Sequence, residues 1–518
     1  MSASKPFRLL ILLLVLPLGL AAARPASAQI ESGALAALLA GGGKLVIAGR
    51  AVDRAPVTDF YRGDGFNPVW TPERRAALAE ALAEAPSHGL DPAAFAVPEA
   101  APAQTEILLT DAFLRYATAL GRGRVAPAAF ESDWLMPQPS VNAVQALSRA
   151  LTAGIAPILA ALAPSDPAYG RLRQAYLRYR DYVSGSAWRP LALPLPLKRG
   201  DSGDAVVTLR RRLAAEDLAP ASDDPAFDDG LVAAVARFQA ARGLPPDGSV
   251  ASATLVALNI SPGERLREIR LNLERWRSMP RDNPAIRVEV NIPGASVVLF
   301  QDNQPTLTMH SVVGQIDHPS PVMRMTMTAV LLNPPWNVPN SIIVNEIRPA
   351  LKKDPDFLKR NRYAYVDVAG GKQLIQLPGA DNALGRIKFE MPNPLDIYLH
   401  DTPAPSLFDR SRRALSHGCI RVDNPRELAR LVLAGNPAWP MDAIDAAIAT
   451  GKTRSVKLPH AIPVYLFYRT AWVDADGTVE FRNDVYGRDQ RLNQALAQRD
   501  QKDQRAPDTR ADAVPGKG

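Results

Sequence analysis

The stretch Ser416-His417-Gly418-Cys419-Ile420-Arg421 contains the only cysteine among 518 residues and places groups that can move a proton around it. A lone cysteine cannot form an internal disulfide, and a thiol becomes reactive where a base, a cation or a helix N-terminus lowers its pKa from about 8.5. His417 lies two residues away, and His400 ends the preceding apolar run 396–400. The pattern predicts a Cys/His nucleophilic site. A small buried hydrophobe is the ordinary alternative for a free cysteine.

The N-terminus has the pattern of a secretion signal. Lys5 and Arg8 precede the apolar run from Leu9 to Leu20, and Ala26-Ser27-Ala28 offers a small-x-small cleavage site. We expect residues 1–28 to be a signal peptide and the chain to be exported. The run is short for a membrane span, which needs about 20 residues, and an uncleaved inner-membrane anchor is the alternative. Exported proteins generally use their cysteines in disulfides, and a single cysteine cannot form one within the chain. Its presence in an oxidising compartment therefore favours the catalytic interpretation.

Length and composition indicate a globular chain of about three domains. Hydrophobic residues make up 47% and charged residues 22%, both ordinary values for folded domains. The net charge is +7, yet Lys and Arg alternate with Asp and Glu along most of the chain. Nucleic acid binding is therefore not indicated, whereas a mildly basic surface suits a protein working beside an anionic envelope polymer.

The first part of the chain is predicted to be helical. Thr71 can cap a helix that starts at Pro72, Leu78 and Leu82 share one face, and Gly89 can end it. Similar patterns recur at 112–120, 141–153 and 169–182. We expect a flexible lead or a short helix over 29–49 and a helical domain over 50–190, completed by the helical stretch 262–280.

A Pro-rich linker then leads into a compact unit at 195–260, for which the apolar spacing predicts three small helices. From 285 the pattern changes to alternation: Val288, Val290 and Ile292 face one way, and Pro293-Gly294 turns the chain back. Residues 285–470 are predicted to be β-rich, interrupted by a helical, charged insertion at about 341–384. The polar tail 487–518 is expected to be disordered.

Several sequence segments of the unit at 195–260 resemble the peptidoglycan-binding type 1 module. These are Leu197-Lys198-Arg199-Gly200-Asp201-Ser202-Gly203, Phe227-Asp228, Val235-Ala236-Arg237-Phe238-Gln239 and Gly243-Leu244-Pro245-Pro246-Asp247-Gly248. A spacer that no longer binds glycan is the alternative for this unit.

The pattern His400-x(15)-Ser416-His417-Gly418-Cys419 resembles the signature of the YkuD-type L,D-transpeptidases. The likeness extends to Asn333-Pro334-Pro335-Trp336-Asn337-Val338-Pro339-Asn340, Leu384-Gly385-Arg386 and Tyr398-Leu399-His400-Asp401-Thr402-Pro403. It implies a multidomain α+β chain like the large Gram-negative members: a helical scaffold domain, a three-helix peptidoglycan-binding module, and a β-rich catalytic domain with a helical capping insertion. A periplasmic location follows from the same resemblance.

The resemblance also implies roles for individual residues. Cys419 would be the nucleophile, His400 its general base and later acid, and the backbone carbonyl of Asp401 would orient His400. Gly418 would supply an oxyanion-binding amide, and His417 would support the loop or the oxyanion pocket. For Arg421, binding of a substrate carboxylate and an ion pair with Asp423 are equal alternatives. Ser416, Tyr398 and Trp336 are candidates for substrate binding, with core packing as the alternative for the two aromatic residues.

The implied reaction joins a tetrapeptide donor to a diaminopimelate acceptor through a cysteine thioester, forming a 3→3 cross-link in peptidoglycan. Water or a free D-amino acid as acceptor would give carboxypeptidation or exchange instead. A zinc site is not indicated, because the pattern lacks HExxH and paired CxxC motifs; we expect no cofactor. The remaining alternative is a non-catalytic scaffold that binds the wall through residues 197–259. Other wall-synthesis enzymes are candidate partners.

Overall fold

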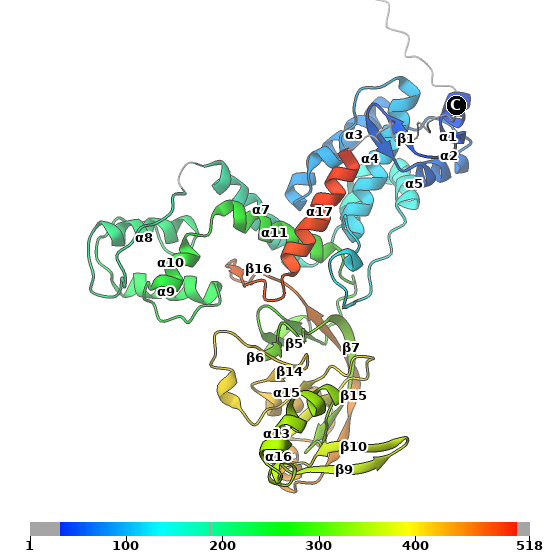
Figure 1. Cartoon of the computed structure of the whole chain (residues 1–518). Helices are drawn as coiled ribbons and strands as arrows, with labels where there is room; N and C mark the ends of the chain where they lie inside the picture. Colours follow the sequence, from blue (N-terminus) through cyan, green and yellow to red (C-terminus); the bar gives the residue numbers. More distant parts are fainter. Residues whose placement is uncertain (1–31, 186–187, 505–518) are drawn as a thin grey trace, which may run out of the picture.

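The computed structural model describes residues 32–185 and 188–504, so the predicted signal peptide lies outside the described residues. The chain forms a helical part, a small helical module and a β-rich part (Figure 1). The multidomain α+β class predicted from the sequence is confirmed. Within the described ranges no helix combines the length and apolarity that a membrane crossing requires.

The helical part surrounds one long central helix, α4 (Pro102–Arg122), which is buried along most of its length. Its other helices are α1 (Ser32–Ala40), α2 (Arg54–Gly63), α3 (Pro72–Ala83), α5 (Ala143–Ala153), α6 (Ile155–Leu162) and α7 (Pro167–Ser184), with a hairpin of β1 (Leu45–Ile47) and β2 (Arg50–Val52). Thr71 caps α3 as predicted, since its side chain accepts a hydrogen bond from the Arg74 amide.

Two expectations for this part need correction. Of the alternatives for 29–49, the short helix is present as α1, whereas the flexible lead is wrong: the segment also forms the hairpin β1–β2, and Leu35 and Ile47 are buried in the helical core. Gly89 does not end α3: that helix stops at Ala83, and Gly89, with φ of +68°, closes a short 3-10 turn at Ala85–His88. An Ala-rich segment can contribute a few buried side chains to a core without showing strong periodicity.

The small module consists of α8 (Asp204–Ala215), α9 (Asp229–Ala241) and α10 (Ser252–Leu258) around a core that includes Val206, Leu231 and Phe238. Gln239 is buried and holds the turn before α10, because its side chain accepts from the Gly248 amide at 2.8 Å and donates to Asp247 at 2.9 Å. The Gln and Asp-Gly positions quoted for the resemblance therefore have a structural role.

Helix α11 (Pro262–Arg277) follows the module and packs on α7. Ile269 and Leu273 of α11 join Tyr169 and Leu172 of α7 in one buried cluster. The hairpin of β16 (Ala471–Val473) and β17 (Val479–Phe481) from the C-terminal region packs into the same cluster. The helical part, the module and the C-terminal region thus meet at α7 and α11.

The β-rich part is a sheet that closes on itself. Its neighbouring strands run β11-β12-β14-β6-β5-β4-β15-β7, and β11 also pairs with β7. The bounds are β4 (Arg287–Asn291), β5 (Ser296–Gln301), β6 (Gln304–Gly314), β7 (Val322–Leu332), β11 (Ile387–Glu390), β12 (Leu399–His400), β13 (Ala414–Ser416), β14 (Ile420–Val422) and β15 (Arg454–Phe467). Helices α15 (Pro425–Val432) and α16 (Met441–Ala449) add to its core. A short strand of the helical part, β3 (Trp134–Leu135), pairs with β7.

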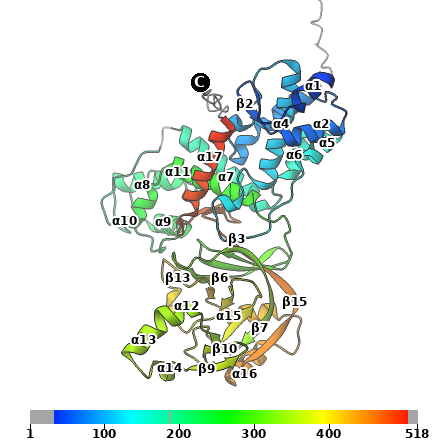
Figure 2. The ribbon, with the colours of Figure 1, turned by 45° about the vertical axis from the view of Figure 1, so that its right-hand side comes forward.

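The insertion expected to be helical is only partly so. Figure 2 shows α12 (Asn340–Ile342), α13 (Arg348–Lys353) and α14 (Phe357–Arg360) gathered on one side of the β-rich part. The rest is a hairpin of β9 (Tyr363–Val368) and β10 (Gly371–Gln376), which also pairs with β8 (Trp336–Asn337). The β-branched and aromatic residues of β9 and the glycines at 370 and 371 explain the hairpin. We call residues 340–376 the cap.

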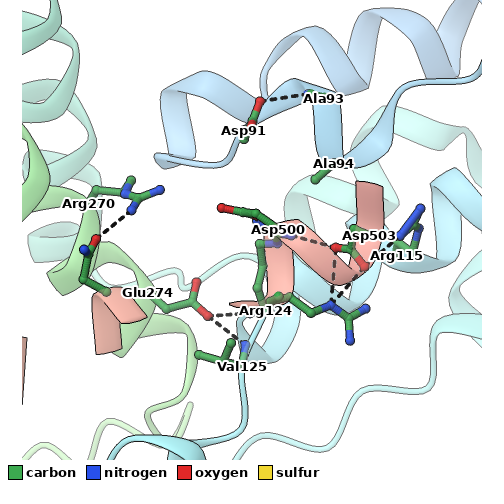
Figure 3. A network of polar contacts seen from close by, with 12 residues as sticks. Asp91, Ala93, Ala94, Arg115, Arg124, Val125, Arg270, Glu274, Asp500 and Asp503 are labelled. Atoms are coloured by element: carbon green, nitrogen blue, oxygen red, sulfur yellow. Dashed lines mark hydrogen bonds and ion pairs between the residues drawn. The ribbon is translucent and has the colours of Figure 1, made fainter. Parts of the chain in front are cut away.

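The polar tail expected to be disordered begins with a helix, α17 (Arg488–Gln504), which lies against α4 and α11; residues 505–518 lie outside the described ranges. Leu492 and Leu496 are buried on one face of α17, and Arg488 pairs with Glu131 at 2.8 Å. Figure 3 shows Asp503 of α17 between Arg115 and Arg124 of the helical part, at 3.2 and 2.7 Å. The polar composition led to a wrong prediction of disorder for this segment. Only a few leucines of α17 are buried, and its charged residues pair with residues that are distant in the sequence.

Candidate active site

Three adjacent short strands place chemically active side chains on one face of the sheet. Lys388 on β11 lies opposite His400 on β12, and His400 lies opposite Arg421 on β14. Residues directly opposite on paired strands point to the same face, with Cβ atoms about 5 Å apart. The intervening Phe389, Leu399 and Ile420 are fully buried in the core on the other face. These apolar residues therefore fix the orientation of the polar ones.

Cys419 directly precedes β14. It lies beside Tyr398, the residue two positions before His400 in the sequence. The Ile420 amide donates to the Tyr398 carbonyl at 3.0 Å, which holds the two segments together. The thiol of Cys419 is partly accessible and donates to the Asp396 carbonyl at 3.5 Å. Burial raises the pKa of Cys419, whereas hydrogen bonds from Tyr398 and the positive charges of Lys388 and Arg421 oppose that rise.

His400 is buried, with 4% of its surface exposed, and its ring meets the Tyr398 ring edge-on at 5.6 Å. Burial, followed by the positive charges of Arg421 and Lys388, lowers the pKa of His400 to about 3. The Asp401 carbonyl favours the charged ring, but His400 Nδ1 has no partner within hydrogen-bonding geometry in the described part of the chain. At neutral pH the resting pair is therefore a neutral imidazole beside a neutral thiol.

The Asp401 carboxylate is held by the backbone and does not contact the reacting groups. It accepts from the amides of Arg386 and Thr402, both at 2.7 Å. Gly385 makes this approach possible: its φ is +63°, and a Cβ there would lie 2.4 Å from the Asp401 Cγ. Leu384-Gly385-Arg386 thus shapes the loop that carries His400.

Ser416 and Gly418 build the loop around the nucleophile. The Ser416 hydroxyl donates to the Cys419 carbonyl at 2.6 Å and accepts from the Gly418 amide at 3.2 Å. Gly418 has a φ of +113°, and its carbonyl accepts from Ser320 at 2.7 Å. The Gly418 amide already has a partner in this loop, so an oxyanion would have to compete with the Ser416 hydroxyl for it.

His417 contacts the cap. Its Nε2 lies 3.0 Å from a carboxylate oxygen of Glu346, and its ring lies beside the His318 ring, tilted by 32°, with centroids 4.8 Å apart. Glu346 belongs to a π-helical turn, Ile343–Ile347, between α12 and α13. His417 therefore joins the nucleophile loop to the cap.

The remaining candidate residues have different surroundings. Arg421 does not pair with Asp423, which instead accepts from the His310 amide at 3.0 Å. The predicted alternative of an Arg421–Asp423 ion pair is wrong. The pKa of Tyr398 is raised, chiefly by burial and then by the neighbouring Cys419. Trp336 also packs against the small core of the cap.

The sequence did not indicate Lys388 and Glu346 as site residues. Lys388 stands between the buried Ile387 and Phe389. This alternation indicates that Lys388 lies on a polar face of the strand, but it does not indicate which residue of the neighbouring strand lies opposite it. Glu346 sits in a charged insertion without an obvious motif. Within residues 32–185 and 188–504, no group of three His, Cys, Asp or Glu side chains is arranged to hold a metal.

Comparison with family models matches three segments of the chain. Residues 285–439 match the L,D-transpeptidase catalytic domain, residues 55–175 a scaffold domain, and residues 202–258 a domain described as a "Putative peptidoglycan binding domain". The resemblances noted in the sequence are thereby confirmed.

A curated relative, a "Putative L,D-transpeptidase" of Haemophilus influenzae, is 32% identical over 244 residues. The match covers 44% of this chain and 49% of the relative, so this chain spans about half of that protein's length.

Similar solved structures include L,D-transpeptidases from Xylanimonas cellulosilytica and Stackebrandtia nassauensis. The first is 17% identical, covers 54% of this chain and 100% of its own, and has a TM-score of 0.19. The second is 12% identical, covers 53% and 97%, and has a TM-score of 0.22. Scores this low support no conclusion about individual residues or about the arrangement of the domains.

Proposed function

We propose that this chain is a cysteine-dependent L,D-transpeptidase of the periplasm that forms 3→3 cross-links between diaminopimelate residues of peptidoglycan. The observation that supports the proposal is the pairing of His400 on β12 with Arg421 on β14, which brings His400 next to the chain segment that carries Cys419, within the region that matches the L,D-transpeptidase catalytic domain. The match of residues 202–258 supports peptidoglycan as the polymer on which the chain acts.

In the first step Cys419 attacks the carbonyl of the third residue of a tetrapeptide stem. The thiol proton passes to His400, which is neutral at rest and so able to accept it. The bond from sulfur to carbon forms, the bond to the terminal D-alanine breaks, and the imidazolium returns the proton to the departing amine. The product of this step is a thioester on Cys419.

In the second step the side-chain amine of diaminopimelate on another stem attacks the thioester. His400 takes a proton from that amine and returns one to sulfur as the new amide forms. The cap contacts the loop around Cys419 through Glu346 and His417, and in this proposal it restricts access to the thioester. A covered thioester is less exposed to water, which favours transfer over hydrolysis.

The test is to incubate the purified chain with disaccharide-tetrapeptide fragments and analyse the products by mass spectrometry. We expect dimers joined through two diaminopimelate residues, each with the loss of one alanine. Cys419→Ala should abolish them, whereas substitution of the exposed Ser411 in the same segment should not. Tripeptides alone would indicate a carboxypeptidase that uses the same site. Unchanged tetrapeptides with retained binding to isolated walls would indicate a non-catalytic scaffold.

A further inference from the structure

Two cations flank the buried imidazole without an acidic partner. Lys388 and Arg421 lie on either side of His400 in the same row of the sheet, and neither forms an ion pair in the described part of the chain. The Nε atom of Arg421 is buried without a hydrogen-bond partner, and Lys388 Nζ lies 4.1 Å from the centre of the Tyr398 ring. Both side chains are only partly buried, so a ligand can reach them.

The acidic residues around this row are engaged elsewhere. The Asp401 carboxylate accepts from two backbone amides, and Glu390 accepts from the Ser455 hydroxyl at 3.0 Å. The Asp396 backbone carbonyl accepts from the thiol, the Asp396 carboxylate is not among the charges that shift the pKa of His400, and Glu346 lies 3.0 Å from His417 Nε2. The charges that act on His400 are therefore those of Lys388 and Arg421, and both disfavour a second positive charge on the ring.

Buried or half-buried cations without a counter-ion are unfavourable in a folded protein, and guanidinium and ammonium groups together are well suited to a carboxylate. A carboxylate bound between Lys388 and Arg421 would neutralise the charge that keeps His400 unprotonated. The amino-acid carboxylates of peptidoglycan stem peptides belong to this chemical class.

We propose that Lys388 and Arg421 bind a substrate carboxylate beside His400, and that this carboxylate enables His400 to take the proton of Cys419. The inference rests on the proposed function, because it concerns the same nucleophile. The proton moves from sulfur to an imidazole nitrogen, leaving a thiolate and an imidazolium, and no other bond changes. Without a bound carboxylate the pair stays neutral, so the nucleophile is activated only when substrate is in place.

The first experiment compares alkylation of Cys419 by iodoacetate and by iodoacetamide. Because the chain has one cysteine, the mass of the intact protein reports this thiol alone. Relative to free cysteine, we expect iodoacetate to be favoured by at least about tenfold, and this preference to fall about tenfold in Lys388→Met and in Arg421→Met. Lys457→Met, an exposed cation on β15, should leave the preference unchanged.

The second experiment tests the coupling to proton transfer. N-acetyl-D-alanine is added as a carboxylate probe, and the rate of iodoacetamide alkylation is followed from pH 5 to 9. We expect the midpoint of the profile to move to lower pH in the unmodified chain and in Lys388→Arg, but not in Lys388→Met. Equal alkylation preferences in all variants, or an unchanged or slowed profile with the probe, would overturn the proposal.

Neither measurement uses peptidoglycan, so its outcome is separate from that of the fragment assay. Failure of the fragment assay with selective alkylation intact would reject the proposed function alone. Cross-linking without the alkylation preference would reject the carboxylate site alone. Thermal unfolding of each variant shows whether a lost preference comes from misfolding, and rescue by Lys388→Arg attributes it to charge.

Discussion

At the scale of single residues, the site depends on a close approach between Gly385 and Asp401. The carboxylate of Asp401 occupies the space that a Cβ at position 385 would need, and it holds the loop that follows His400 through two backbone amides. This contact holds the backbone that directly follows His400. Gly385 is therefore required for two reasons: its backbone is left-handed, and there is no room for a Cβ beside Asp401. The free-energy costs of the two can be measured separately by mutation.

We predict that Gly385→Ala weakens β11 and β12 and lowers activity. Gly451→Ala is the matched control, because Gly451 has a φ of +66° and no atom within 4 Å of the added Cβ. The control should cost only the left-handed strain, about 1–2 kcal/mol, whereas Gly385→Ala should cost about 1–3 kcal/mol more from the steric conflict. Native-state hydrogen exchange of the amides of β11 and β12 measures the difference. Equal effects of both variants would show that the loop adjusts freely.

The sequence indicated Cys419 and His400 as the proposed nucleophile and base, but it did not indicate the charges around them. Cys419 and His400 could be identified because their spacing is a motif and because the neighbouring residues alternate. Lys388 could not, since its relation to His400 and Arg421 depends on the pairing of three strands that are separate in sequence. The equal alternatives for Arg421 could not be decided from adjacency, because Asp423 turns toward His310. Site chemistry that depends on strand register thus becomes visible only in the structure.

At the scale of elements, the cap is joined to the loop around Cys419 by a contact between the Glu346 carboxylate and His417 Nε2. Both side chains are considerably exposed, at 53% and 39%, so such a pair contributes no more than about 1 kcal/mol. A contact of this size biases the position of the cap without locking it. We therefore expect the cap to open at a low cost in free energy.

We predict that Glu346→Gln increases opening of the cap by up to about fivefold, the factor that corresponds to about 1 kcal/mol. Hydrogen exchange of peptides covering Ile343–Ile347 measures the opening. The ratio of hydrolysis to cross-linking in the fragment assay should rise with it. Asp367→Asn on the exposed strand β9 is the control and should change neither quantity. Unchanged exchange in Glu346→Gln would show that apolar packing alone holds the cap.

Element prediction from the sequence succeeded where one side chain pattern repeats over many residues. The helix from Pro72 and the strands from Arg287 to Gln301 show such patterns. It failed for β9–β10, which was hidden in a charged insertion, and for α17, where two buried leucines carry the packing. In both cases the stabilising contacts come from distant segments rather than from local propensity.

At the scale of the whole molecule, buried polar contacts connect the three parts. Arg242 of the module pairs with Glu216 and donates to the Val479 carbonyl at 2.8 Å, and Arg482 donates to the Ala241 carbonyl at 3.0 Å. On the opposite side, α17 follows the β-rich part and returns to the helical part. The module is therefore joined to the hairpin β16–β17 by side chains that are largely withdrawn from water.

We predict that Leu492→Ala on α17 loosens the contact between the β-rich and helical parts. Leu492 is fully buried against Phe130 and Leu271, so its truncation should cost about 2–5 kcal/mol of docking free energy. The loss leaves Arg488 and Glu131 paired but exposes their surroundings to water, which weakens that ion pair as well. Hydrogen exchange should accelerate along α17 and the facing turns of α4 and α11. Gln498→Ala, on the exposed side of the same helix, should not have this effect.

Because Cys419 and His400 lie in the closed sheet and not at this joint, alkylation of the thiol should be unchanged. Faster exchange around β12 and β14 in Leu492→Ala would instead show that α17 supports the active site directly.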